Sequence, residues 1–503
     1  MKIFKNYLNL LRLLSIVGLL FISCGVLGDY SSFLPDLGDS DRSVISPVEA
    51  DFLGQKIIQD IYAQGEILDD YDTNAYLNDL GGEIVSYSPM AGASFRFYII
   101  KDKKINAFAL PGGYICIFNG LIYTTRTEAE LVSVISHEIS HIVLHHIFRG
   151  ITVYNRSQWV AIAGILAGGL LAFINPAAAM IAINGVSGMA IENILSFSRD
   201  FEREADRLGQ KLMFKAGFDS RAMPVFFQRM QEQNKFNDNE AYAFLRSHPV
   251  TSERISEAQI RANQLQTKMR PDSTRFLLIR EKCRVRQIGL LAAIEFYKQA
   301  IKTKKYVSLE AQLYGLAFAY YSNKKIEEAT ITLNKITNPE FKNNPIVLSL
   351  KAQLAVASKN YILAEKLYKE ALINFPEYKT LWLGEIDLYF ASRQLTKVSQ
   401  KLQELSELYP NDVDIWGREE LLYSDAYLDN EKKYHYALGN QLYLIGNYKM
   451  ALEQYIIALN GSLDNFSKTQ NKKSDYILND IISSKILDTK EKINFQEKYG
   501  SKD

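Results

Sequence analysis

Four of the six histidines lie within ten residues, from His137 to His146. Two of them frame the string His137-Glu138-Ile139-Ser140-His141. On a helix, a four-residue step nearly completes one turn and brings the imidazoles of His137 and His141 to one face. Two neutral imidazoles can then bind one Zn²⁺, and Glu138 can take a proton from the water that zinc activates. The string therefore predicts the zinc site of a hydrolase; a helix with surface histidines is the alternative.

This string must stand on a rigid element, and the residues around it predict a helix. Thr127 and Glu130 have the spacing of a capping box, which closes the first turn of a helix. Apolar residues with helical periodicity follow at Leu131, Val134, Ile135 and Ile142. We therefore expect one buried helix over residues 127–147.

A catalytic zinc also needs a third protein ligand and an open position. The candidate segment, residues 198–206, is charged and follows a long uncharged stretch. On a helix, Glu202 and Asp206 are four residues apart and share a face. Glu202 can then bind zinc while Asp206 accepts an N–H from a ligand histidine. Spacing alone does not separate Glu202 from Glu204, and a solvated charged face is the alternative for both.

Together with Glu202-Arg203-Glu204-Ala205-Asp206, the histidine string resembles the HtpX/BepA-type membrane-associated metallopeptidases, family forty-eight of that class. Residues 106–114, and Ser247-His248-Pro249 with Arg254, add to the resemblance, which covers about residues 45–265. It implies that Glu202 is the third zinc ligand, that Asp206 supports it, and that the chain is a peptidase with one Zn²⁺. It also implies an α+β zincin fold of the gluzincin type over residues 46–268.

The segment before the catalytic helix is predicted to be a buried strand. From Tyr114 to Phe118, aromatic and thiol side chains alternate with isoleucines, the pattern of a strand buried on both faces. An extended peptide can pair with the edge of this segment through backbone hydrogen bonds. The predicted substrate-binding residues are Ala109, Leu110, Pro111, Gly112 and Gly113. A tight turn that joins two core strands is the alternative.

His248 is one of only two histidines outside the catalytic helix, and we expect it in a loop stiffened by Pro249. In the family that the motifs resemble, the matching histidine can occupy the open zinc position. Carried over to His248, this implies a latch that displaces the catalytic water until a partner moves the loop. Two other roles stay open for His248: hydrogen-bond donation to the tetrahedral intermediate, and packing in a turn.

The first residues are predicted to be a targeting signal. Basic residues precede an apolar run from Leu13 to Ile22 that is too short to span a bilayer. Phe21-Ile22-Ser23-Cys24 resembles a bacterial lipobox, which implies that residues 1–23 are a signal peptide and that Cys24 is lipidated. Residues 24–45 then form a polar tether. We expect a lipid-anchored protein on the periplasmic side of the cell envelope, with the outer membrane favoured.

Residues 157–191 carry no charge and are divided by Asn175-Pro176 into two apolar halves. Each half spans about 22 Å as a helix, less than the ~30 Å hydrocarbon core. Because His141 and Glu202 must meet at one ion, both ends lie on the same side of any membrane. We interpret the segment as a helical hairpin that covers the cleft or dips into lipid; a buried core hairpin is the alternative.

Small and aromatic residues recur after residue 270 with the spacing of tetratricopeptide repeats. One copy is marked by Ala364, Tyr368, Ala371 and Pro376, and the next, 34 residues later, by Val398, Leu402, Leu405 and Pro410. The pattern predicts an all-α solenoid over residues 274–462, with a degenerate first copy at 277–302 and a cap or tail over 463–503. The concave face of such a solenoid would bind protein partners.

Composition narrows the classes of function. The 503 residues are 47% hydrophobic, enough for several buried cores. Lys+Arg of 58 against Asp+Glu of 57 gives a net charge of +1, which argues against a nucleic-acid partner. Three cysteines are too few for a disulfide scaffold, and whether Cys116 and Cys283 pair stays open.

We therefore predict an exported, lipid-anchored zinc metalloendopeptidase that hydrolyses peptide bonds of misfolded or assembling envelope proteins. Its repeats would recruit the envelope protein assembly machinery. The lipid anchor would hold it at the membrane, and residues 157–191 would add a second contact with the lipid if they dip into it. The alternative is a chaperone or assembly scaffold of the envelope with a mostly latched zinc site.

Overall fold

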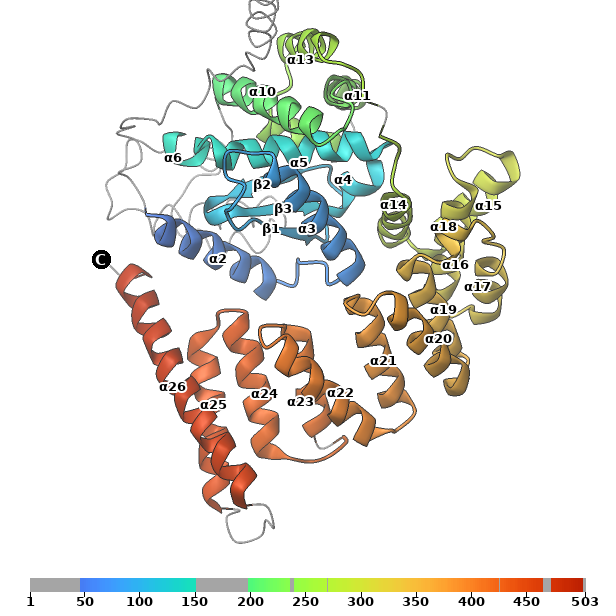
Figure 1. Ribbon diagram of the computed structural model, residues 1–503. Helices are drawn as coiled ribbons and strands as arrows, with labels where there is room; N and C mark the ends of the chain where they lie inside the picture. The colour runs from blue at the N-terminus through green and yellow to red at the C-terminus, as the bar shows by residue number, and fades with distance from the viewer. Residues whose placement is uncertain are drawn as a thin grey trace, which may run out of the picture. The chain divides into compact units, whose positions relative to one another are not determined.

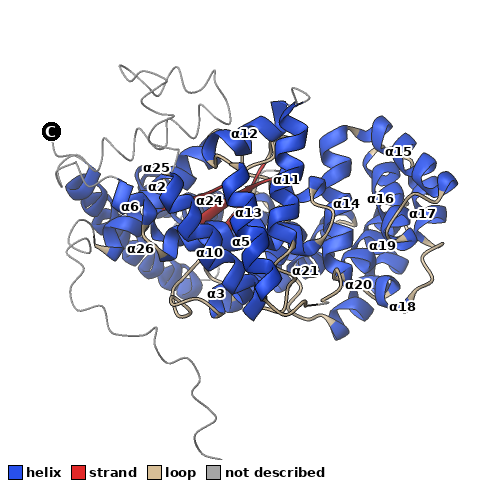
Figure 2. Cartoon of the chain, turned by 90° about the horizontal axis from the view of Figure 1, so that it is seen from above, coloured by secondary structure: helices blue, strands red, loops and turns tan. Residues whose placement is uncertain are grey.

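The computed structural model describes residues 46–150, 198–235, 239–268, 270–424, 426–464 and 472–500. The predicted signal peptide, Cys24, the tether and residues 157–191 lie outside these ranges. The described residues are mostly helical, with one small sheet, which Figure 2 shows in red. Within these residues no helix is both long and apolar enough to cross a membrane.

The sheet has three strands, β1 (Arg96–Ile100), β2 (Ala107–Leu110) and β3 (Tyr114–Phe118), in the order β1-β3-β2. β1 runs parallel to β3 with Arg96 opposite Tyr114, and β2 runs antiparallel to β3 with Leu110 opposite Tyr114. β3 is therefore the central strand and β2 is an edge strand of this sheet.

Successive side chains of a strand point to opposite faces of the sheet. Each face is covered by a separate hydrophobic core. Ile115 and Ile117 join one core with α3 (Tyr71–Ser86) and α5 (Glu128–Val143). Tyr114, Cys116 and Phe118 join a second core with α2 (Pro47–Ala63). The predicted two-faced burial from Tyr114 to Phe118 is confirmed, and Figure 1 shows the sheet between α2 and α5.

Pro111–Gly113 form a 3-10 turn between β2 and β3, with φ of 77° at Gly112 and 86° at Gly113. A Cβ on Gly112 would lie 2.5 Å from the Cα of Asp51, and one on Gly113 would lie 2.3 Å from the carbonyl oxygen of Ser94. These glycines thus let the backbone of the turn approach α2 and Ser94 of the same chain. A tight turn between two core strands is the alternative to substrate binding for this segment. Of the predicted substrate-binding residues, Ala109 and Leu110 lie on the edge strand.

The catalytic helix is shorter than predicted. The Thr127 hydroxyl accepts a hydrogen bond from the Glu130 N–H at 3.2 Å, whereas the Glu130 carboxylate accepts from the Arg126 N–H at 2.8 Å, so the capping box is half formed. α5 ends at Val143, and His145 adopts a left-handed φ of 55° before α6 (His146–Gly150) begins. The prediction of one helix to residue 147 is wrong, because a left-handed residue cannot continue an α-helix.

The second motif lies on α10 (Arg199–Lys215), which begins where the Ser198 hydroxyl accepts from the Phe201 N–H. A Cβ on Gly209 would lie 3.2 Å from the backbone nitrogen of His137, so this glycine lets α10 approach α5 closely. The chain continues through α11 (Ala222–Lys235), α12 (Asn239–Ser247) and α13 (Ser252–Gln264).

All elements of the described residues beyond 273 are helices. α19, α21 and α23 begin at residues 345, 379 and 413, each 34 after the one before, as the repeat pattern predicts. A Cβ on Gly384 would lie 2.5 Å from the Tyr368 hydroxyl, and one on Gly439 would lie 2.6 Å from the Tyr455 ring, so small residues face aromatic ones where helices meet. The helices are α14 (Thr274–Ile288), α15 (Leu290–Thr303), α16 (Leu309–Ser322), α17 (Ile326–Leu333), α18 (Pro339–Lys342), α19 (Pro345–Ala357), α20 (Tyr361–Asn374), α21 (Lys379–Ala391), α22 (Leu395–Leu408), α23 (Val413–Tyr423), α24 (Glu431–Leu444), α25 (Tyr448–Asp464) and α26 (Lys472–Gly500).

α14 joins this helical region to the sheet region. The Lys282 ammonium lies 2.5 Å from the Asp72 carboxylate and 2.9 Å from that of Asp70, and all three side chains are buried. Cys283 on α14 and Cys116 on β3 are both free and buried, so they do not pair. Within the predicted tail, α26 buries Ile482 and Ile486 in a core with α25.

Candidate metal centre

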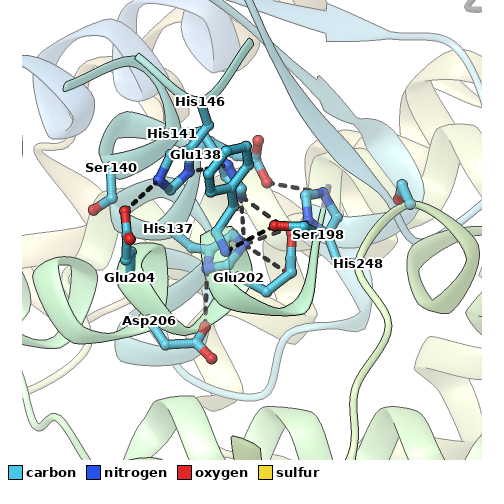
Figure 3. A network of polar contacts seen from close by, with 12 residues as sticks. His137, Glu138, Ser140, His141, His146, Ser198, Glu202, Glu204, Asp206 and His248 are labelled. Carbon is cyan, nitrogen blue, oxygen red and sulfur yellow. Dashed lines mark hydrogen bonds and ion pairs between the residues drawn. The ribbon is translucent and has the colours of Figure 1, made fainter. Parts of the chain in front are cut away.

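Four side chains from three separate parts of the sequence converge on one point (Figure 3). One potential ligand atom from each of His137, His141, Glu202 and His248 lies within 4.8 Å of all the others, and all four residues are buried. The Nε2 atoms of His137 and His141 are 2.9 Å apart, because α5 brings residues i and i+4 to one face. The Glu202 carboxylate lies 3.4 Å from each of these two nitrogens.

Asp206 lies behind the first histidine. Its Oδ1 is 3.0 Å from His137 Nδ1, the distance of an ion pair, and the other ring nitrogen of His137, Nε2, lies in the cluster. Glu202 and Asp206 thus lie together on the face of α10 that packs against α5, as their four-residue spacing predicts. This is the arrangement in which a carboxylate orients a metal-binding histidine.

Glu202 and Glu204, which the spacing could not separate, have different surroundings. Glu202 is fully buried in the cluster, whereas the Glu204 side chain is 39% exposed. The Glu204 carboxylate instead accepts hydrogen bonds from Arg149 at 2.6 Å and lies 3.1 Å from His146 Nε2. Of the two glutamates, Glu202 is therefore the one placed to bind a metal.

Glu138 is buried beside the cluster without belonging to it. Its Oε1 lies 3.3 Å from Nε2 of His248. Burial raises the pKa of Glu138, which makes its carboxylate a stronger base than a glutamate in water. A buried carboxylate within reach of a metal site has the position and basicity of a general base.

His248 lies, as expected, in the connection between α12 and α13, and its side chain is buried. Its N–H donates to the carbonyl oxygen of Phe244 at 2.8 Å, so it continues the last turn of α12, and its side chain is 2% exposed. Its Nδ1 lies 3.1 Å from Glu202 Oε1 and 3.3 Å from His137 Nε2. The preceding Ser247 donates its hydroxyl to Asn106 Oδ1 at 3.0 Å, which ties this turn to the residue before β2.

The charges of the cluster are unevenly distributed. Burial opposes protonation of His137, but the carboxylates of Glu202 and Asp206 outweigh burial and raise the pKa of His137 to about 10. Burial lowers the pKa of His141 well below its usual value. Against the effect of burial, electrostatic interactions with His248 and Arg254 hold the pKa of Glu202 well below its usual range. The carboxylates of Glu202 and Asp206 are thus ionised, and they attract positive charge, on a proton or on a divalent cation, to the imidazoles beside them.

Arg254, on α13, completes the site, although the sequence reasoning gave it no role beyond the resemblance. Its guanidinium donates to both oxygens of Asp206, at 2.7 and 2.8 Å, and lies 2.7 Å from Glu202 Oε2. It also donates to the carbonyl oxygen of Pro249 at 2.8 Å. One buried arginine therefore holds two carboxylates of α10, those of Glu202 and Asp206, and the backbone of Pro249 next to His248.

The residues present fit zinc. His137 and His141 direct one ring nitrogen each into the cluster while the other nitrogen faces a polar group, Asp206 Oδ1 for His137 and His146 Nδ1 for His141. Two imidazoles and one carboxylate are a ligand set of catalytic zinc sites, in which the fourth position stays open for water or substrate. Nδ1 of His248 lies within 3.3 Å of both Glu202 Oε1 and His137 Nε2, so His248 could be a further ligand.

Comparisons with known proteins agree with this chemistry. Residues 72–262 match the family model described as peptidase family M48. The chain is 28% identical over 388 residues to the beta-barrel assembly-enhancing protease of Yersinia pestis, a match that covers 76% of this chain and 79% of that one. It is 27% identical over 424 residues to a putative beta-barrel assembly-enhancing protease of Vibrio cholerae, covering 84% and 87% of the two chains.

A more distant relative carries the same chemistry in its name. The mitochondrial metalloendopeptidase OMA1 of Arabidopsis thaliana is 28% identical over 227 residues, which are 45% of this chain and 44% of that one. The residues of this chain that match the family model contain both motifs, from His137 to His141 and from Glu202 to Asp206. Over residues 72–262 the chain therefore carries a domain of peptidase family M48, and it is a zinc metalloprotease.

Proposed function

We propose that the protein is an envelope metalloendopeptidase that cleaves peptide bonds of misfolded or assembling proteins. In this proposal residues 46–268 form a zincin domain and residues 274–462 a tetratricopeptide solenoid that recruits protein partners. The observation that carries the proposal is the buried group of His137, His141 and Glu202 with the Glu138 carboxylate beside it.

His137, His141 and Glu202 would hold one Zn²⁺ per chain, with Asp206 and Arg254 fixing their orientation. Bound there, zinc would supply Lewis acidity toward the scissile carbonyl and toward water. Glu138 would take the proton of the attacking water and deliver it to the leaving amine. An extended substrate would pair with the edge strand β2 at Ala109 and Leu110, which lie on the sheet next to α5.

The partners follow from the relatives and from the repeats. Two relatives are named for enhancing β-barrel assembly, which supports a role beside the machinery that assembles envelope proteins. The helical region offers paired helices, the architecture that proteins use for extended protein-binding surfaces. We place the protein on the periplasmic side of the envelope, held by lipid at the outer membrane.

A second candidate function is a chaperone or assembly scaffold with a closed zinc site. The observation that favours it is the position of His248 Nδ1 among the ligand atoms of the cluster. Replacing Glu138 by glutamine in cells separates the two functions. A scaffold keeps its cellular function after that change, and a protease loses it.

The latch makes a prediction for His248→Ala. If His248 holds the fourth position, its removal should raise basal cleavage of an unfolded protein substrate, by about tenfold if one molecule in ten is open at rest. The measurement is the initial rate for the zinc-loaded protein, with His435→Ala on α24 as the control that should not change the rate. Lower activity with zinc and fold intact would reject the latch in favour of hydrogen-bond donation to the intermediate, and an unchanged rate would favour simple packing.

The anchor makes a separate prediction for Cys24→Ala. Without the acceptor cysteine the exported protein should fractionate with soluble envelope proteins, because a lipid chain is what holds it at the membrane. Fractionation of cells that express either form, followed by immunoblotting, measures this. Tight membrane attachment of the variant would contradict the prediction and transfer the role to residues 157–191.

A further inference from the structure

His141 makes a second polar contact, on the side of its ring away from the cluster. Its Nδ1 lies 2.9 Å from Nδ1 of His146, and both side chains are fully buried. A histidine that binds metal through Nε2 carries its proton on Nδ1 and needs an acceptor there. Within the described residues, Nδ1 of His146 is the neighbouring acceptor, and it accepts that hydrogen when it is unprotonated, which places the proton of His146 on its Nε2.

The Glu204 carboxylate accepts the hydrogen bond from the Nε2–H of His146. His146 Nε2 lies 3.1 Å from Glu204 Oε2, and the Arg149 guanidinium donates to the two Glu204 oxygens at 2.6 and 3.3 Å. Arg149 thus holds the Glu204 carboxylate, and this carboxylate fixes the tautomer of His146. The tautomer of His146 in turn fixes that of His141. Figure 3 shows Glu204 and His146 on the far side of His141 from Glu202.

Packing keeps His146 in this position. Its ring stacks on Phe201 of α10, with centroids 4.5 Å apart and planes 7° apart. The guanidinium of Arg149 lies 4.6 Å from the centroid of the same Phe201 ring. α6 is therefore fastened to α10 by a stacked ring, a cation–π contact and an ion pair.

The backbone explains how two histidines five residues apart can meet. On a regular helix they would be separated by about 140° around the axis and would point away from each other. The left-handed φ of 55° at His145 ends α5 and turns His146 back toward His141. The break between α5 and α6 thus brings His146 into contact with His141 at the metal centre.

We propose that His146 and Glu204, with Arg149, form a positioning relay that fixes the tautomer and ring orientation of the zinc ligand His141. The relay rests on the proposed zinc site and is the counterpart of the direct contact between Asp206 and His137. α10 then supplies one ligand, Glu202, and supports for both histidine ligands, Asp206 directly and Glu204 through His146.

The experiment measures zinc affinity of the purified full chain by competition with a chelator. His146→Ala should weaken zinc binding about 10- to 100-fold, the usual effect of removing a hydrogen-bond partner of a metal ligand. It should also shift the visible absorption bands of the Co²⁺-substituted protein, because the orientation of His141 changes. His145→Asn is the matched control: His145 is exposed, and asparagine tolerates its left-handed backbone, so zinc affinity should not change.

Glu204→Ala should weaken zinc binding in the same direction, by roughly tenfold. The double variant should bind zinc no more weakly than His146→Ala alone, because the two residues act in series. Glu204 is partly exposed, so its variant decides the question even if His146→Ala fails to fold. Zinc affinity within twofold of wild type in either folded variant, or additive losses in the double variant, would overturn the relay. Failure of the wild-type chain to bind zinc would instead overturn the proposed function.

Discussion

Glu138→Gln should abolish measurable peptide cleavage while leaving the zinc content of the protein unchanged. The glutamine has the size of the buried glutamate but cannot accept a proton, and general-base catalysis contributes about 10²- to 10⁴-fold to such reactions. Glu138 is not one of the four residues that offer ligand atoms, so its replacement should not change the affinity of the protein for the metal. The measurement is kcat on an unfolded protein substrate together with the zinc content of the same preparation.

A matched control is Glu232→Gln, which changes an exposed glutamate on α11 and should leave both quantities at the wild-type level. Cleavage by Glu138→Gln at the wild-type rate would show that another group takes the proton. Loss of zinc together with activity would show that Glu138 supports the metal rather than the chemistry.

Arg254→Met should produce the largest loss of stability. Arg254 is 1% exposed and is the guanidinium that pairs with both Glu202 and Asp206. Removing one partner of a buried ion pair costs about 3–5 kcal/mol, because the remaining charges stay buried without compensation. For a domain of the size of residues 46–268, the midpoint of thermal unfolding should fall by roughly 10 °C.

Two further variants separate charge from geometry. Arg254→Lys keeps the positive charge but not the planar fork that reaches Asp206, Glu202 and the Pro249 carbonyl, so its loss should be intermediate. Arg261→Met removes an arginine of the same helix that is 21% exposed and donates to Gln210 Oε1, so it should cost about 1–2 kcal/mol, less than Arg254→Met. A midpoint for Arg254→Met within 2 °C of that of Arg261→Met would contradict the prediction.

The sequence by itself determined the local parts of this site. The pairing of His137 with His141 and the shared face of Glu202 and Asp206 follow from helical geometry within one turn. The two-sided burial of β3 follows from alternation along five residues. The period of 34 residues, read from small and aromatic residues, likewise recurs between the starts of α19, α21 and α23.

Other features depend on single backbone angles or on close packing, which a pattern of residue types does not contain. The predicted catalytic helix ran through residue 147, but the left-handed φ of His145 ends it at Val143. The same angle brings His146 onto His141, a contact that helical spacing argues against. Pro111–Gly113 pack against α2 and Ser94 because two glycines with positive φ allow it.

Only the tertiary structure decided which charged residues belong to the metal centre. Glu202 and Glu204 are two residues apart and chemically alike, and they differ because one face of α10 packs on α5 while the other meets α6. His248 reaches His137 across 111 residues of sequence, and Arg254 reaches Asp206 across 48. Such contacts depend on how whole helices pack, since the burial of their apolar faces, rather than the polar residues themselves, sets where each helix lies.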